Sequence, residues 1–163
     1  IALETIITTN HPDRYQFLKL PLFPDVLPGR GALGGIYTAL QTAAQPLVAV
    51  VACDMPFASP AILRAGRDIL LADPGLDAVI PSSEHGLEPL HAVYRRATCL
   101  PAVKAAIESG QWKAISWHGD VNVCVLIPAE IAQLDPDGSA FLNVNTPQEL
   151  KAAIEHARHS AEG

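Results

Sequence analysis

The chain has 163 residues, a length typical of one domain that buries a core without disulfide or metal support. Apolar residues make up 49% of it and charged residues 17%, which is typical of a globular α/β protein. The formal net charge is -6 and no basic run occurs, so we expect no nucleic-acid partner. No apolar run approaches the roughly 20 residues of a membrane span, so we expect no membrane partner either.

The cysteines are Cys53, Cys99 and Cys124, and they form no CxxC pair, which argues against a zinc site. We expect each thiol to be a small buried hydrophobe. Free thiols in an acidic chain without a signal-peptide pattern indicate a cytoplasmic protein.

The chain opens with Ile1, inside a β-rich run, and its one methionine is Met55. A natural start rarely falls inside a strand. We therefore expect residues upstream of Ile1, and we interpret 1–163 as a single domain that lacks its N-terminal segment.

Predicted strands and helices alternate along the chain. The predicted strands are 1–9, 47–53, 77–80, 90–94 and 121–127, and the predicted helices are 34–42, 60–72, 97–109 and the segment from 147 onward. This alternation predicts a three-layer α/β fold with a mostly parallel sheet and helices on both of its faces. The wholly apolar run 47–53 predicts a central strand, whereas Pro89 favours an edge position for 90–94.

Local signals mark the beginnings of two of these helices. Ser59 precedes Pro60, the typical order of a helix-capping residue and a proline in the first turn. Thr146 and Glu149 have the spacing of a capping box, again with a proline between them.

Chemistry in such sheets takes place beyond the carboxyl ends of the strands. Asp54 directly follows the apolar strand, where a carboxylate needs a partner, and Mg²⁺ on a phosphate substrate is a natural one. The alternative is that Asp54 only forms the turn before Ser59. Asn143 and Asn145 are two residues apart, so in extended chain both side chains point to one side and could line a cleft, or else they only form turns.

The run from Pro28 to Ile36 contains four glycines within seven positions and leads into a helix. Glycines let backbone approach a ligand closely, and a helix start offers free N–H groups to an anion. The spacing matches neither a Walker A loop nor a dinucleotide-binding fingerprint, so a plain flexible turn stays open. His91 alternates with apolar neighbours, which favours a structural over a catalytic role.

Together these motifs resemble the molybdenum cofactor guanylyltransferases over essentially the whole chain. The resemblance is carried, in chain order, by Asn10, Asp25, Gly31-Ala32-Leu33-Gly34-Gly35-Ile36, Cys53-Asp54-Met55-Pro56, Glu88-Pro89-Leu90 and Phe141-Leu142-Asn143-Val144-Asn145-Thr146-Pro147. It implies a Rossmann-like nucleotidyltransferase fold. It also implies that the terminal phosphate of molybdopterin attacks the α-phosphorus of GTP, so that pyrophosphate leaves and the guanine dinucleotide cofactor forms.

The resemblance implies roles for individual residues. Asp54 would hold Mg²⁺, and the catalytic set would be Asp54, Asn143 and Asn145. The nucleotide would be bound by Asn10, Asp25, Gly31, Leu33, Gly34 and Asp54. The expected partners are GTP, molybdopterin or the molybdenum cofactor, and proteins of molybdoenzyme assembly.

The sequence also departs from that family. Members open with a strand and a Leu-Ala-Gly-Gly-x-Ser-x-Arg-Met-Gly loop followed by a lysine, none of which this chain contains, and Ala32 stands where proline is usual. We therefore expect the 163-residue chain alone to be inactive. Two alternatives stay open: a cytidylyl- or sugar-phosphate nucleotidyltransferase, and a truncated, non-catalytic binding module for molybdoenzyme assembly. The Leu33-Gly34-Gly35 sequence favours the guanylyl type.

Overall fold

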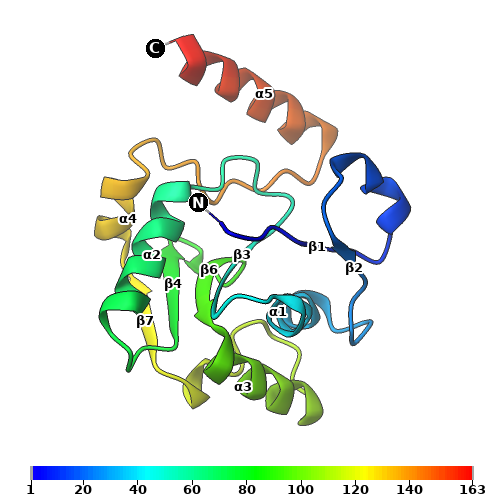
Figure 1. Cartoon of the computed structure of the whole chain (residues 1–163). Coiled ribbons are helices and arrows are strands. Elements are labelled where there is room, and N and C mark those ends of the chain that lie inside the picture. The colour runs from blue at the N-terminus through cyan, green and yellow to red at the C-terminus, as the bar shows by residue number, and fades with distance from the viewer. Residues whose placement is uncertain (1, 163) are drawn as a thin grey trace.

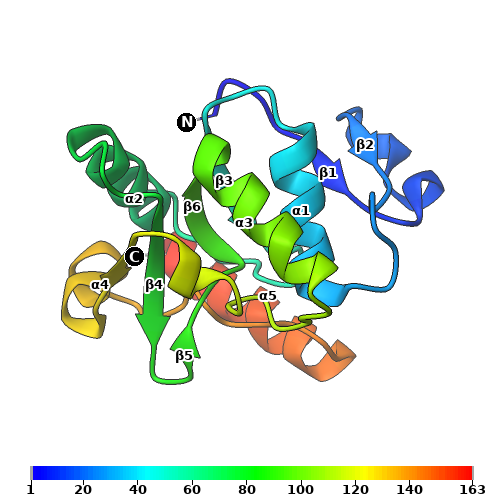
Figure 2. The same ribbon diagram turned by 90° about the horizontal axis from the view of Figure 1, so that it is seen from below.

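A sheet lies between two pairs of helices in the computed structural model, which describes residues 2–162. The strands are β3 (Leu47–Val51), β6 (His91–Arg95), β4 (Ala78–Ser83) and β7 (Val123–Leu126) in spatial order, with β5 (Gly86–Leu87) paired to the end of β4. One face carries α1 (Gly31–Thr42) and α3 (Arg96–Glu108), and the other carries α2 (Pro60–Ala72) and α4 (Pro128–Leu134) (Figure 2). The predicted three-layer α/β fold is confirmed.

Alternation along the strands divides the interior into two cores. In β6, Ala92 and Tyr94 pack with the α1 and α3 side, whereas Val93 packs with the α2 and α4 side. In β4, Val79 likewise points to the face opposite to Ile80. Successive strand residues point to opposite faces, so a sheet covered on both sides needs apolar residues at consecutive positions.

The directions of the strands determine which strand ends lie together, and a ligand site forms at such ends. β3, β4 and β7 run in one direction, as a parallel-dominated sheet requires, and β6 runs against both of its neighbours. The prediction of a central 47–53 strand is wrong for the described residues, because β3 pairs only with β6. The predicted edge position of β6 is also wrong, since Pro89 precedes its first paired residue and removes no ladder hydrogen bond.

The N-terminal segment lies outside this sheet (Figure 1). β1 (Ile7–Thr8) pairs in parallel with β2 (Leu22–Phe23), and two short 3₁₀ helices, η1 (Pro12–Arg14) and η2 (Gln16–Leu18), lie between them. The predicted strand 1–9 is therefore much shorter than expected, and Ile1 lies outside the described residues.

The helix signals of the sequence are confirmed. The Ser59 hydroxyl accepts a hydrogen bond from the Ile62 N–H at the start of α2. Thr146 and Glu149 form reciprocal side-chain-to-backbone bonds at the start of α5 (Pro147–Glu162). The helix α1 begins at Gly31 rather than at residue 34, and β4 continues through Pro81 to Ser83. The sequence did not reveal α4, β5 or the 3₁₀ helix η3 (His118–Asp120).

Consecutive arginines join β6 to helices on both faces of the sheet. The Arg95 guanidinium donates to the carbonyls of Leu70 and Leu76 around the end of α2, at 2.7 and 2.9 Å. Arg96 donates to the Leu40 carbonyl near the end of α1, at 2.8 Å. Carbonyls at a helix end lack intrahelical partners, so one dipeptide satisfies groups in both helix layers.

The three thiols differ from the uniform burial that we expected. Cys99 is buried, and burial raises the pKa of its thiol to about 12. Cys124 is half-buried, and Cys53 is exposed in the turn after β3, where expected burial is wrong. No helix within residues 2–162 is long and apolar enough to cross a membrane.

Candidate functional site

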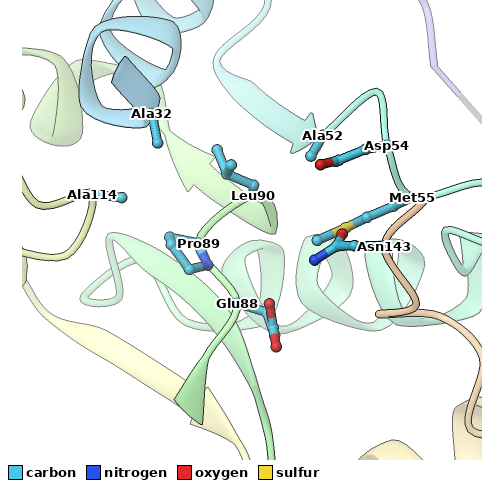
Figure 3. Close-up of a pocket in the computed structure, with 9 residues that line it drawn as sticks. All are labelled: Ala32, Ala52, Asp54, Met55, Glu88, Pro89, Leu90, Ala114 and Asn143. Atoms are coloured by element: carbon cyan, nitrogen blue, oxygen red, sulfur yellow. The ribbon is translucent and has the colours of Figure 1, made fainter. Parts of the chain in front are cut away.

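A depression of about 270 Å³ lies where β3 ends and β6 begins (Figure 3). It is lined by Ala32, Ala52, Asp54, Met55, Glu88, Pro89, Leu90, Ala114 and Asn143. Because β6 is antiparallel to β3, the carboxyl end of one strand meets the amino end of the other. The residues that follow β3 and those that precede β6 therefore share one site.

Asp54 and Asn143 come together although 89 positions separate them. The Ala52 N–H donates to the Leu90 carbonyl at 2.8 Å, which continues the β3–β6 ladder up to the turn that carries Asp54. The Val144 N–H then donates to the Asp54 carbonyl at 2.8 Å, which brings the C-terminal segment against that turn. Figure 3 shows Asp54, Met55 and Asn143 on the same side of the depression.

The fully buried His91 holds the other end of the Asp54 turn. Its Nε2 accepts a hydrogen bond from the Ser59 N–H at 2.9 Å, and its ring meets Phe141 edge-on with centroids 5.3 Å apart. Burial lowers the pKa of His91, and the negative charges of Glu88 and Asp135 partly oppose this shift. The ring is therefore neutral and links the segments of Asp54 and Asn143, which supports the predicted structural role.

The wall formed by Glu88 and Pro89 is fixed from the core. The Tyr94 hydroxyl donates to the Pro89 carbonyl at 2.6 Å, and burial raises the pKa of Tyr94. The Ser83 hydroxyl donates to the Glu88 carboxylate, also at 2.6 Å. These bonds hold the wall in one geometry before any ligand arrives.

The glycine-rich segment has a geometric reason for its glycines. Gly31 has a φ of +54°, a left-handed conformation that favours glycine at the start of α1. A Cβ on Gly34 would lie 2.8 Å from the Cβ of Arg30, so only glycine permits this close approach. Leu33 is fully buried in the core, so it offers a ligand its backbone alone. Gly31 and Ala32 are exposed, and Ala32 lines the depression.

Asn10 and Asp25 bond to each other outside the depression. Asn10 Nδ2 donates to the Asp25 carboxylate at 2.8 Å, and the Asp25 N–H donates to Asn10 Oδ1 at 3.0 Å. The structure thus unites two residues that the sequence separates by 15 positions.

Asn145 does not join Asn143 in the depression. Its N–H donates to the Glu149 carboxylate at 2.7 Å, which places it at the start of α5. The backbone N–H groups of Asn145 and Thr146 lower the pKa of Glu149. Sequence reasoning also missed Met55 and Ala114 as lining residues, and no sequence signal marked Ala114.

The oxygen donors of the site suit one kind of metal complex. Within residues 2–162 no group of three or more His, Cys, Asp or Glu side chains is placed to hold a metal ion. Mg²⁺ does not need such a cage, because it commonly uses one or two carboxylates together with water and substrate phosphates. The half-buried Asp54 carboxylate beside the Asn143 amide fits this pattern.

The chain is similar to known proteins over most of its length. The model of the MobA-like NTP transferase domain matches residues 2–121. The chain is 34% identical to a probable molybdenum cofactor guanylyltransferase of Pelotomaculum thermopropionicum over 163 residues, which cover 100% of this chain and 78% of that protein. It is 30% identical to a molybdenum cofactor guanylyltransferase of Desulfosudis oleivorans, with 92% of this chain and 73% of the relative covered.

Solved structures share the fold. Molybdopterin-guanine dinucleotide biosynthesis protein A of Archaeoglobus fulgidus superimposes with a TM-score of 0.78 at 28% identity, covering 95% of this chain and 79% of that one. The 2-C-methyl-D-erythritol 4-phosphate cytidylyltransferase of Thermus thermophilus has a TM-score of 0.64 at 16% identity, with coverages of 96% and 83%, and shows likeness of fold alone. The chain belongs to the MobA-like NTP transferase family.

Proposed function

We propose that this protein transfers GMP from GTP to molybdopterin, with or without its metal, and releases pyrophosphate. The observation that carries the proposal is the convergence of Asp54 and Asn143 on one depression beyond the end of β3, in a chain of this family. Relatives named molybdenum cofactor guanylyltransferase match nearly the whole chain, which supports GTP and molybdopterin as the substrates.

The reaction requires positioning more than covalent chemistry. A terminal phosphate oxygen of molybdopterin forms a bond to the α-phosphorus of GTP, while the bond from that phosphorus to the bridging oxygen breaks and pyrophosphate leaves with the electron pair. Asp54 would hold Mg²⁺, which offsets the charge of the phosphates when it is bound. Asn143, tied to the Asp54 turn through Val144, would donate an amide N–H to a reacting phosphate oxygen. The role of Asn145 in this reaction is less direct, because its backbone N–H donates to the Glu149 carboxylate at the start of α5.

The nucleotide would lie on the side of Asn10, Asp25 and the start of α1. The Asn10 amide and Asp25 carboxylate offer donors and acceptors for a base and a ribose, once a ligand replaces their mutual bonds. The exposed backbone at Gly31, with the backbone of the buried Leu33 and Gly34 behind it, would approach the base. We also propose that the protein works in the cytoplasm and meets proteins of molybdoenzyme assembly there.

The experiment is a competition between nucleotides. The protein made from its complete gene is incubated with Mg²⁺, molybdopterin and equal amounts of GTP, CTP and ATP, and the pterin dinucleotide products are separated by mass. We expect the guanine dinucleotide in at least tenfold excess over the others. A cytosine dinucleotide as the main product would identify a cytidylyltransferase. No dinucleotide, together with binding of molybdopterin, would favour the binding module.

A further inference from the structure

The depression has an apolar part that differs from the surroundings of Asp54. Its polar side chains are Asp54, Glu88 and Asn143, and the remaining lining residues are Ala32, Ala52, Met55, Pro89, Leu90 and Ala114. Six of the nine lining residues are apolar, so the part of the depression away from Asp54 suits a flat ring better than a charged phosphate. The volume of about 270 Å³ lies just below the roughly 300–1,000 Å³ of sites for drug-sized ligands, so it fits one ring system of a larger substrate.

A cation–π pair, Arg30 and Trp112, lies close in sequence to two residues of this apolar part. Figure 3 shows Ala32 and Ala114 at the end of the depression away from Asp54. Arg30 precedes Ala32 by two residues and Trp112 precedes Ala114 by two residues, and the Arg30 guanidinium carbon lies 4.6 Å from the centroid of a Trp112 ring. The Trp112 side chain is nevertheless 61% exposed. A guanidinium on the indole limits its motion, while most of the ring surface stays open to a ligand.

We propose that Trp112 stacks on the flat pterin ring of the acceptor and that Arg30 is a positioning residue for the indole. This inference rests on the proposed guanylyl transfer and names the residues that bind its acceptor. Guanine is also a flat bicyclic ring, and the start of α1, which is assigned above to the nucleotide, also contributes Ala32 to this depression. Asn10 and Asp25, the side chains assigned to the nucleotide, do not line it, and the experiments below distinguish the two rings. The attacking and leaving oxygens lie roughly in line across the α-phosphorus, so the acceptor and pyrophosphate occupy opposite sides.

Tryptophan fluorescence detects a pterin bound close to Trp112 without catalysis, and the Trp112→Phe variant separates its contribution from that of Trp117. The sequence has two tryptophans, and Trp117 is fully buried, so a ligand at the surface reaches Trp112. We expect 6-hydroxymethylpterin to quench the emission saturably, and GTP to cause less than a fifth of that change. In Trp112→Phe the saturable component should fall by at least half, and the part that remains comes from energy transfer between Trp117 and the bound pterin. Saturable quenching that is unchanged in this variant, or no saturable quenching in the unaltered protein, would overturn the inference.

Steady-state kinetics separate the acceptor from the nucleotide. Trp112→Ala should raise the KM for molybdopterin at least tenfold and leave the KM for GTP within twofold, a change of the size typical of base–aromatic stacking. Trp112→Phe should stay within about threefold because it keeps an aromatic face. Arg30→Gln should raise the molybdopterin KM about threefold, with kcat unchanged. The matched control is Leu71→Ala on α2, since Leu71 is 65% exposed and its helix covers the other face of the sheet.

The outcomes distinguish the inference from the function on which it rests. A higher KM for GTP alone would place Trp112 at the nucleotide and overturn the inference, as would unchanged constants for both substrates. Dinucleotide formation without pterin quenching would overturn only the inference. Saturable quenching by 6-hydroxymethylpterin without any dinucleotide formation would overturn the guanylyl transfer, while the pterin contact would stand.

Discussion

The sheet with its four helices and the two peripheral segments, 2–30 and 141–162, are stabilised in different ways. In the sheet, β4 and β6 lie between two buried clusters, and Arg95 and Arg96 connect the end of β6 to the ends of α2 and α1. The peripheral segments contain strands of two residues, β1 and β2, and the helix α5, whose apolar residues Leu150 and Ile154 are exposed. Figure 1 shows α5 beside the layered part rather than within it.

The candidate site contains residues from both regions, so the geometry of the site depends on how the two regions are joined. Asp54 follows a strand of the sheet, and Glu88 and Pro89 are held by Ser83 and Tyr94. Asn143 belongs to a peripheral segment. This segment is joined to the sheet by the hydrogen bond from the Val144 N–H to the Asp54 carbonyl and by the contact of Phe141 with His91. We therefore expect turnover to depend on the sheet region. We expect the local stability of α5 to depend on its own capping residues.

The largest expected effect is on turnover, in the variant Asp54→Asn. This change preserves shape but removes the charge that would hold Mg²⁺, so kcat for dinucleotide formation should fall at least a hundredfold, or about 2.7 kcal/mol. Folding should survive, because a half-buried unpaired charge is removed. The control is Asp137→Asn, in an exposed loop. A folded Asp54→Asn protein with near-normal activity and unchanged Mg²⁺ dependence would contradict the metal-ligand role.

The next effect tests the sheet region itself. Arg95→Met keeps much of the apolar stem but loses the charged bonds to the carbonyls of Leu70 and Leu76, so the free energy of unfolding should fall by about 2 kcal/mol. Urea unfolding followed by circular dichroism measures it. Arg64→Met, an exposed change within α2, should stay within about 0.5 kcal/mol. Equal losses in both variants would show that Arg95 has no special role at the end of α2.

A smaller effect in the same region depends on pH. Both ring nitrogens of His118 are buried without a hydrogen-bond partner among the described residues, and burial lowers its pKa from 6.5 to about 4. The unfolded chain takes up a proton below about pH 6.5 while the folded chain does not. Stability from this group is therefore present at pH 7 and declines between pH 6.5 and 4, by about 1 kcal/mol after solvent screening is allowed for.

His118→Phe isolates this contribution, because it keeps a ring against Trp117 but cannot titrate. Unfolding free energies of the variant and the unaltered protein, measured in urea at pH 7 and pH 4.5, should differ in favour of the variant at the lower pH. A difference that is the same at both pH values would rule out the proposed titration.

The smallest effect belongs to the periphery. Thr146→Ala removes the hydroxyl that accepts from the Glu149 N–H, which should cost α5 about 1 kcal/mol of local stability. Hydrogen exchange of α5 amides should become faster, while the urea midpoint of the sheet region stays the same. Thr146→Ser should retain the original exchange rates. A matching drop in the global midpoint would show that α5 unfolds together with the sheet and would remove the distinction between the two regions.

Prediction from sequence worked where the signal was local. The capping residues of α2 and α5 acted as their spacing indicated. Gly34 also has a local reason to be glycine, because a Cβ at this position would collide with the Cβ of Arg30, four residues earlier. The sequence could not show that Arg95 bonds to α2. Every arginine has the same side chain, and the carbonyls that Arg95 binds are brought to it only by the packing of α2 against the sheet.

By itself the sequence determined the alternation of strands and helices, the helix starts, and the polar residues beyond the end of β3, because these depend on periodicity and on side chains acting on nearby backbone. Tertiary structure alone decided that β6 is central and β3 lies at the end of the described sheet order. It also decided that Asn143 lines the depression while Asn145 does not. The order of the strands and the contacts between distant residues depend on hydrogen bonds between separate segments. The residue pattern within one segment does not encode those bonds.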